Sequence, residues 1–338
     1  MHPLIRTERA RRALFPARLP QWRVWIGHRK GRAGDRVTPN PRRSPQELGL
    51  VTLNYSLRDY RFSLPRLEPT LNNIMPTLCE FDVTQSTIHF PRLFVDCPRL
   101  AHGIRELDIG KNAGVRVTSR LQHITNRSAD CHITPWGDST LYSAVADVLA
   151  LAPGDLDFLT GEHMHNLWMN PNDPASVRID FERPFATPPK VVVFLSCIDL
   201  DENHNWRLKT TATDVDVNGF TLNIETWSDT VLRAARAGWI AYPEDREHIF
   251  SKSVNTMDVR PWNRPQAKQS SEVKFNAVEF WKKPSVFIAL NSLDIACKAN
   301  LRVNAYVDSV STTHLVWHID TWADTVLYSA GATIIAFN

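Results

Sequence analysis

The chain has 338 residues, of which 43% are hydrophobic and 22% charged, a composition typical of a globular protein of two or three domains. No stretch approaches the roughly 18 consecutive apolar residues that a membrane-spanning helix needs, which argues against a spanning protein. Five cysteines are too few, and odd in number, for a disulfide scaffold.

The net charge of +3 conceals a basic N-terminal region joined to a mildly acidic body. Residues 1–70 hold 15 basic and 5 acidic side chains, and residues 1–50 combine twelve basic residues with six prolines. Such a segment buries too little apolar surface to offset its ordering entropy, so we predict a disordered Arg-rich region over residues 1–71. One interpretation is an Arg-rich arm that binds nucleic acid or an anionic membrane. The other is a solvated segment or an organelle-targeting leader. The acidic body argues against a nucleic-acid partner because it offers no folded basic surface.

The first arginines are not followed by an apolar segment, so we expect no secretory signal. This pattern is expected both for a cytoplasmic protein and for a non-classically secreted one.

Three segments of the body repeat one pattern of Asp, Arg, Trp and Asp with intervals of 8, 20 and 2 residues. The three sets are Asp108, Arg116, Trp136, Asp138; Asp199, Arg207, Trp227, Asp229; and Asp294, Arg302, Trp322, Asp324. The copies lie 91 and 95 residues apart, which is the size of a domain and too long for a solenoid repeat. We therefore predict three homologous domains over residues 72–152, 153–245 and 246–338.

Each copy is expected to consist of strands. Runs such as KVVVFLSCIDL (190–200) and SVFIALNSLDI (285–295) are short, apolar and β-branched, and no helix-length stretch has a period of 3.6 residues. Five or six strands in about 90 residues predict a small antiparallel β-sandwich, so the fold class is all-β.

Alternation along the strands places the repeated Arg and Trp away from the aliphatic face. Leu315, Trp317 and Ile319 share one face, whereas Trp322 has the parity of the opposite, polar face. An Arg and a Trp that both face outward predict a binding site or an interface. The structural alternative is a Trp at the sandwich edge covered by a stacked Arg. The Asp two residues after each Trp, and the Asp that begins each set, are expected to bond turns.

At these residues the sequence resembles the H-type lectin domain, a family that binds galactose and N-acetylgalactosamine. The matching elements are the PP-K-V-V-V strand ending in I-D-L, the strand Arg, and T-W-x-D-T followed by a W-I-A strand. The second copy matches best and the first most loosely. The resemblance implies six-stranded sandwiches that associate as trimers, with a shallow sugar site where neighbouring sandwiches meet.

The resemblance also implies the site residues, which comprise an Arg, a Trp, a Tyr six residues after the Trp, and a loop Asp. The matching positions are Arg116, Trp136, Tyr142, Arg207, Trp227, Arg302, Trp322, Tyr328 and Asp258. The second copy has Arg233 at the Tyr position, and Asp82 and Glu162 are looser matches to the loop Asp. A His that follows the Trp in the family is replaced by Gly137, Ser228 and Ala323.

Three tandem copies predict an intrachain pseudo-trimer with its sites at the boundaries between copies, and further oligomerisation remains open. Tandem copies also suit weak single sites, because effective concentration raises the overall avidity.

No catalytic fingerprint is present, so we expect neither an enzyme nor a cofactor. The repeated carboxylates leave a glycosidase as an alternative, but three approximate copies favour binding over catalysis. The run from Asp199 to Asn205 lacks the Gly and Glu of a calcium loop, and His163 and His165 lack partners at ligand spacing, so we expect no metal site.

The sequence therefore predicts a multivalent carbohydrate-binding protein with glycan partners. The alternative is a structural or adhesive interaction protein that keeps the sandwich without binding sugar.

Overall fold

Strands make up nearly all regular structure in the computed structural model, in which residues 49–56, 84–91, 93–276 and 278–338 are described. The expected disordered region lies outside these residues except for one strand, and so does Asp82. The strands are β1 (Gly49–Ser56), β2 (Thr84–His89), β3 (Arg99–Ile109), β4 (Val115–Gln122), β5 (Ser128–Pro135), β6 (Leu141–Leu151), β7 (Leu159–Asn166), β8 (Ser176–Asp180), β9 (Lys190–Leu200), β10 (Trp206–Thr213), β11 (Gly219–Glu225), β12 (Leu232–Tyr242), β13 (Ile249–Asn255), β14 (Ser270–Lys274), β15 (Ser285–Ile295), β16 (Leu301–Asp308), β17 (His314–Asp320) and β18 (Leu327–Phe337). A 3-10 turn, η2 (Thr256–Asp258), follows β13.

Each repeat contributes six strands, and the all-β fold of three tandem repeats is confirmed. The first repeat begins earlier than residue 72, because β1 pairs with β6 as β7 pairs with β12 and β13 with β18. Within a repeat, one group of three strands packs on another through a shared apolar core, as β3 and β6 do on β4 and β5.

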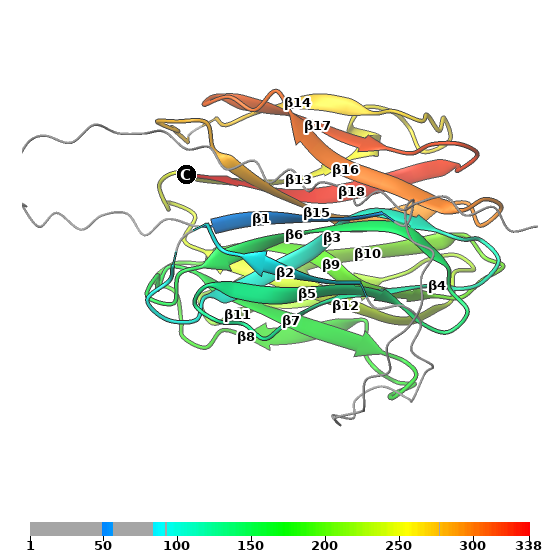
Figure 1. Cartoon of the computed structure of the whole chain (residues 1–338), viewed down its shortest axis with the longest axis horizontal. Coiled ribbons are helices and arrows are strands. Elements are labelled where there is room, and N and C mark those ends of the chain that lie inside the picture. Colours follow the sequence, from blue (N-terminus) through cyan, green and yellow to red (C-terminus); the bar gives the residue numbers. More distant parts are fainter. Residues whose placement is uncertain (1–48, 57–83, 92, 277) are drawn as a thin grey trace, which may run out of the picture. The chain divides into compact units, whose positions relative to one another are not determined.

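The strands form three six-stranded antiparallel sheets, and each sheet takes three strands from each of two repeats (Figure 1). The order β2-β5-β4-β9-β12-β7 joins repeats 1 and 2, and β8-β11-β10-β15-β18-β13 joins repeats 2 and 3. The order β1-β6-β3-β16-β17-β14 joins repeat 3 back to repeat 1. The repeats thus close into an intrachain pseudo-trimer, which pairs strand edges that a lone sandwich would leave exposed.

The outer strands alternate between buried and partly exposed residues, as the sequence pattern predicts. In β17, Leu315, Trp317 and Ile319 are buried, and the four residues that alternate with them are partly exposed. This alternation arises because one face of the strand packs on the core and the other faces solvent.

A second apolar cluster lies where the three repeats meet, and there β3, β9 and β15 contact one another (Figure 1). The equivalent positions of the three repeats carry Gly103, Phe194 and Ala289. A Cβ added to Gly103 would lie 2.4 Å from the Cβ of Ala289 and 2.9 Å from the Phe194 ring. The centre therefore accommodates the Phe194 ring because its two equivalents are the smallest residues.

Candidate functional site

The Arg of each repeat lies opposite an Asp of the next repeat at the central strand pair of each sheet. The register pairs Arg116 with Asp199, Arg207 with Asp294, and Arg302 with Asp108. The distances from Nε to Oδ1 in these pairs are 3.5, 3.4 and 3.4 Å, respectively. We call these boundaries seam 1–2, seam 2–3 and seam 3–1. The expectation that these Asp residues bond turns is wrong, because each one faces a guanidinium of the neighbouring repeat.

A second carboxylate from the same repeat holds each guanidinium. Nη1 of Arg207 lies 2.5 Å from Oδ1 of Asp229 and donates to Oγ1 of Thr230 at 3.2 Å. The equivalent pairs are Arg302 with Asp324, and Arg116 with Asp138. Sequence reasoning assigned these Asp residues to turn capping, which missed their contact with the guanidinium.

The turn after the Trp brings this carboxylate back to the Arg. The residue between Trp and Asp has a left-handed backbone in all three repeats, with φ of 66° at Gly137, 59° at Ser228 and 55° at Ala323. The resemblance implies a His directly after the Trp, and Gly, Ser and Ala stand at that position in the three repeats. The left-handed turn recurs in all three repeats, but none of them carries an imidazole there.

Continuing the strand register places the Trp of each repeat beside its Arg. β10 and β11 pair Lys209 with Glu225, so Arg207 lies opposite Trp227 two residues further on. Oγ1 of Thr226 donates to the carbonyl oxygen of Arg207 at 2.7 Å, which fixes this approach.

These Trp side chains lie outside the apolar core. Trp227 is 39% exposed, and Trp136 and Trp322 are half-buried. By contrast, Trp206 and Trp317 are buried within the core. The Trp227 indole is therefore accessible to solvent, whereas the Arg207 side chain is only 13% exposed.

The Tyr positions lie across the seam from the Arg and Trp. β15 and β18 pair Asp294 with Ser329 and Ile295 with Leu327, so Tyr328 is the extra residue of a β-bulge beside Asp294. The same bulge in the first repeat places Tyr142, which is 45% exposed, beside Asp108. Each seam therefore combines Arg and Trp of one repeat with Asp and the Tyr position of the next.

At seam 1–2 a Trp outside the repeated Arg and Trp positions covers the Asp, whereas at seam 3–1 Asp108 is bonded by Asn300 and Trp322 of repeat 3. Nε1 of Trp168 donates to Oδ2 of Asp199 at 3.0 Å, and the Asp199 side chain is only 2% exposed. Arg233, at the Tyr position, stacks on the Trp168 ring at 5.0 Å and pairs with Asp201. The corresponding side-chain exposures are 14% for Asp294 and 18% for Asp108.

Asp258 lies on the loop after β13, next to β18. Its Oδ2 accepts the backbone N–H of Asn255 at 2.8 Å and closes a capping box around η2. The same loop carries Trp262, whose ring stands edge-on to Tyr328 with centroids 6.3 Å apart. Sequence reasoning missed Trp262, for which the only signal was an aromatic residue in a Pro-rich loop.

The other sequence candidates lie close to ionisable side chains of this chain. Glu162 contacts the buried His102 of repeat 1 at 3.2 Å and lies away from the seam Arg residues. His165 lies 3.3 Å from Asp173. Among the residues that the structure describes, no group of three or more His, Cys, Asp or Glu side chains is arranged to hold a metal ion.

Burial and pairing move the pKa values of the seam carboxyls in opposite directions. Desolvation raises the pKa of Asp108, Asp199 and Asp294 against the opposing charge of their Arg partners. Hydrogen bonding to the Arg lowers the pKa of Asp229 and Asp324, which are exposed. At seams 2–3 and 3–1, Asp294 and Asp108 therefore take up a proton at a higher pH than Asp229 and Asp324.

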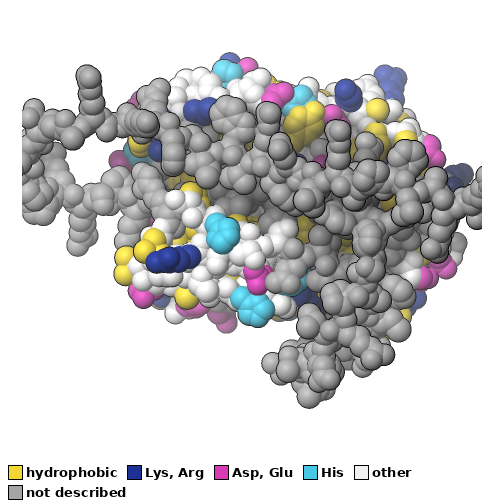
Figure 2. Space-filling view, viewed as in Figure 1, with side chains coloured by type: hydrophobic (Ala, Val, Ile, Leu, Met, Phe, Trp, Pro, Cys, Tyr) yellow, Lys and Arg dark blue, Asp and Glu magenta, His cyan; other side chains and the backbone are white. Residues whose placement is uncertain are grey.

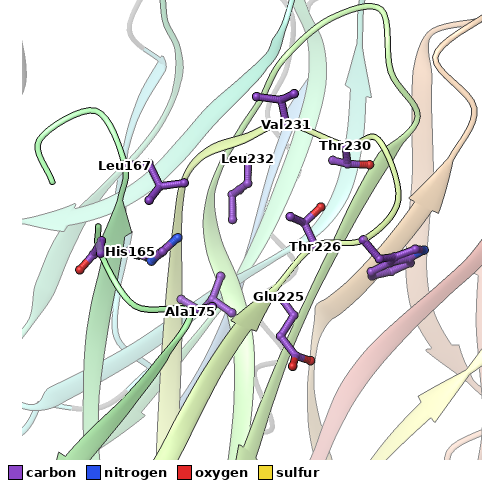
Figure 3. Close-up of a pocket in the computed structure, with 11 residues that line it drawn as sticks. His165, Leu167, Ala175, Glu225, Thr226, Thr230, Val231 and Leu232 are labelled. Carbon is purple, nitrogen blue, oxygen red and sulfur yellow. Dashed lines mark ion pairs between the residues drawn. The ribbon is translucent and has the colours of Figure 1, made fainter. Parts of the chain in front are cut away.

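A pocket of about 750 Å³ adjoins Trp227 at the end of repeat 2 (Figure 3). It is lined by His165, Leu167, Asp173, Ala175 and residues of the segments 224–227 and 230–232. Figure 3 shows His165 and Leu167 on one side of it, Thr226 and Thr230 on the other, and Leu232 between them.

Charged side chains of both signs are interspersed on the described surface that Figure 2 shows. No helix among the described residues is long and apolar enough to cross a membrane.

Comparison with known proteins agrees with this arrangement. The model of the H-type lectin domain matches residues 85–151, 176–242 and 270–337, one match for each repeat and together more than half of the chain. A protein of Fuscovulum blasticum described as "ATP synthase subunits region ORF 7" is 36% identical over 93 residues, which are 27% of this chain and 77% of that protein. The three matches coincide with the three sandwiches, whose seams hold the paired Arg and Trp. The chain therefore belongs to the H-type lectin domain family, a family of carbohydrate-binding domains, and contains three tandem copies.

Proposed function

We propose that this chain is a multivalent lectin that binds terminal galactose- or N-acetylgalactosamine-type sugars at its seams, in cell adhesion or glycan recognition. The observation that carries the proposal is the geometry of seam 2–3. There Arg207 and the exposed Trp227 lie two residues beyond the paired Lys209 and Glu225, and Asp294 and the bulge residue Tyr328 belong to the next repeat across the seam.

The chemistry of these groups suits a pyranose. The C–H face of a sugar packs on an aromatic ring, and its hydroxyls both donate to carboxylates and accept from a guanidinium. Nη2 of Arg207 has no hydrogen-bond partner among the described residues, so it is available as a donor. Such a shallow contact predicts a single-site Kd of roughly 0.1–1 mM.

The three seams are not equivalent in this proposal. At seam 2–3, Arg207 is the ion-pair partner of Asp294 within the described residues, which leaves acceptor capacity on that carboxylate. At seam 1–2, Trp168 occupies Oδ2 of Asp199 and Arg233 replaces the Tyr. We expect sugar at seams 2–3 and 3–1, and none at seam 1–2.

A structural or adhesive module without sugar binding is the second candidate. Two observations favour it. Each guanidinium already faces two carboxylates, and the residue after each Trp lacks the imidazole that the resemblance implies. In this reading, the Arg and Asp residues serve to hold the repeats together.

A glycan array of the full chain tests the proposal, with Trp227→Ala and Trp322→Ala as site variants. Trp281→Ala is a matched control, since Trp281 is 66% exposed and lies outside the seams. Binding to galactose-type glycans that both site variants weaken, with thermal unfolding unchanged, supports the lectin. Absence of binding by the unmodified chain supports the structural module.

A further inference from the structure

The pocket beside Trp227 has an apolar interior with acidic groups at its boundary. Leu167, Ala175 and Leu232 line it together with Asp173 and Glu225. Among the described residues that line it, none is Lys or Arg. The pocket therefore offers negative charge next to an aliphatic surface, which favours a ligand with a cation on an apolar stem.

A buried imidazole adds an acceptor to this pocket. His165 is 3% exposed, and its Nδ1 has no hydrogen-bond partner, although Oδ2 of Asp173 lies 3.3 Å away. Oδ2 of Asp173 accepts the backbone N–H of Asn166 at 2.7 Å, which holds the carboxylate in place. A donor that approaches both atoms from the pocket would bond the carboxylate together with Nδ1, in the tautomer that carries its proton on Nε2.

Repeat 3 fills the equivalent space with an arginine of its own. Leu327 is the equivalent of Leu232, and Gln269 immediately precedes β14 as Ala175 precedes β8. Both contact Arg260, which is 6% exposed: its Nη2 donates to the carbonyl oxygen of Leu327 at 2.8 Å and to Oε1 of Gln269 at 3.3 Å.

The same guanidinium also donates through Nη1 to the carbonyl oxygen of Tyr328 at 2.8 Å. Among the described residues, Arg260 has no carboxylate as an ion-pair partner. Desolvation lowers the pKa of the Arg260 guanidinium. The fold thus accommodates a guanidinium here even without the negative charge that repeat 2 provides.

We propose that the pocket of repeat 2 binds a guanidinium on an aliphatic stem, such as the side chain of arginine. Asp173 and Nδ1 of His165 accept from the guanidinium, and Glu225 contributes charge at the rim. The stem packs on Leu167 and Leu232. A guanidinium suits these scattered acceptors because it presents five donors in one rigid plane. This site is separate from sugar binding, although Trp227 borders both.

Calorimetric titration of the full chain with butylguanidinium tests this proposal, with butylurea as a neutral probe of nearly the same shape. We expect butylguanidinium to bind and butylurea to bind at least about tenfold more weakly, since the charge-assisted bonds are lost. Asp173→Asn keeps an acceptor for the Asn166 N–H, and we expect it to weaken butylguanidinium binding about tenfold.

Glu225→Gln provides a second variant at an exposed position, so the test stands even if Asp173→Asn does not fold. It should weaken binding less than Asp173→Asn does, and galactoside binding should be unchanged in both variants. Equal binding of the two probes, no binding of butylguanidinium, or variants that bind it like the unmodified chain would overturn the proposal.

Discussion

Arg207 of the second repeat and Asp294 of the third face each other at the centre of one continuous sheet, with Nε 3.4 Å from Oδ1. The same pairing recurs at the other two boundaries, so an equivalent Arg–Asp pair marks every junction of the pseudo-trimer. The pairs lie where strands of different repeats are hydrogen-bonded. Stability of the assembly and geometry of the candidate sugar site therefore depend on the same side chains.

Removing one of these arginines should destabilise the whole chain. Arg207→Ala leaves Asp294 and Asp229 without their shared cation, and we expect a loss of about 1–3 kcal/mol in the free energy of unfolding. This expected loss is smaller than the loss for a fully buried ion pair, because Asp229 is exposed and solvent screens its charge. Urea unfolding measures the change, with Arg178→Ala as the control for an exposed pair. Equal losses in the two variants would contradict this account.

Seam 1–2 should gain sugar binding when its cover is removed. Trp168→Ala combined with Arg233→Tyr frees Oδ2 of Asp199 and restores the aromatic residue of the other seams. We expect calorimetry with methyl galactoside to show two binding equivalents in the unmodified chain and a third in the double variant. Three equivalents before substitution would show that seam 1–2 is already open.

Sugar affinity should fall on acidification before the fold is lost. The pKa of Asp294 is raised, so its carboxylate is protonated above the ordinary Asp value and stops accepting from sugar hydroxyls. Because the folded state takes up this proton more readily than the unfolded state, the protonation itself favours folding. The pKa of Asp229 is lowered, so its contribution to stability is lost only at lower pH.

Titrations between neutral pH and about pH 4 check this order, with circular dichroism to monitor the fold. Asp294→Asn should remove the pH dependence at seam 2–3. Constant affinity over the whole range would argue against a carboxylate in the binding step.

The centre of the pseudo-trimer should not tolerate a larger residue at position 103. Gly103→Ala places a methyl 2.4 Å from Ala289 and 2.9 Å from the Phe194 ring, and we expect a cost of about 1–3 kcal/mol. Adding Ala289→Gly removes the closer of these contacts and should restore part of the stability. Thermal unfolding of the two variants measures this, and additive losses would contradict a shared site at the centre.

Strand content and the three copies could be predicted because they depend on local patterns. The alternation in 314–320 follows the sheet faces, and the intervals between Arg, Trp and Asp recur exactly in sequence. The apolar run of β9 also indicates a strand that is buried on both faces. One of those faces lies at the centre of the pseudo-trimer.

Partners across the seam could not be predicted from sequence. Asp199 lies near the end of an apolar strand, a position where carboxylates often bond turns, and only the register between β4 and β9 reveals its partner Arg116. Trp168 gave no signal because its contact with Asp199 depends on how a loop folds back. The pairing of Arg116 with Asp199 arises between repeats, and the contact of Trp168 with Asp199 arises from a loop within repeat 2.

A crystal structure of the chain with saturating methyl galactoside, at concentrations well above roughly 1 mM, is the most direct test of sugar binding at the seams. The account predicts a pyranose packed on Trp227 at seam 2–3, with hydroxyls bonded to Arg207 and Asp294. Sugar bound elsewhere, or absent from every seam at saturation, would contradict it.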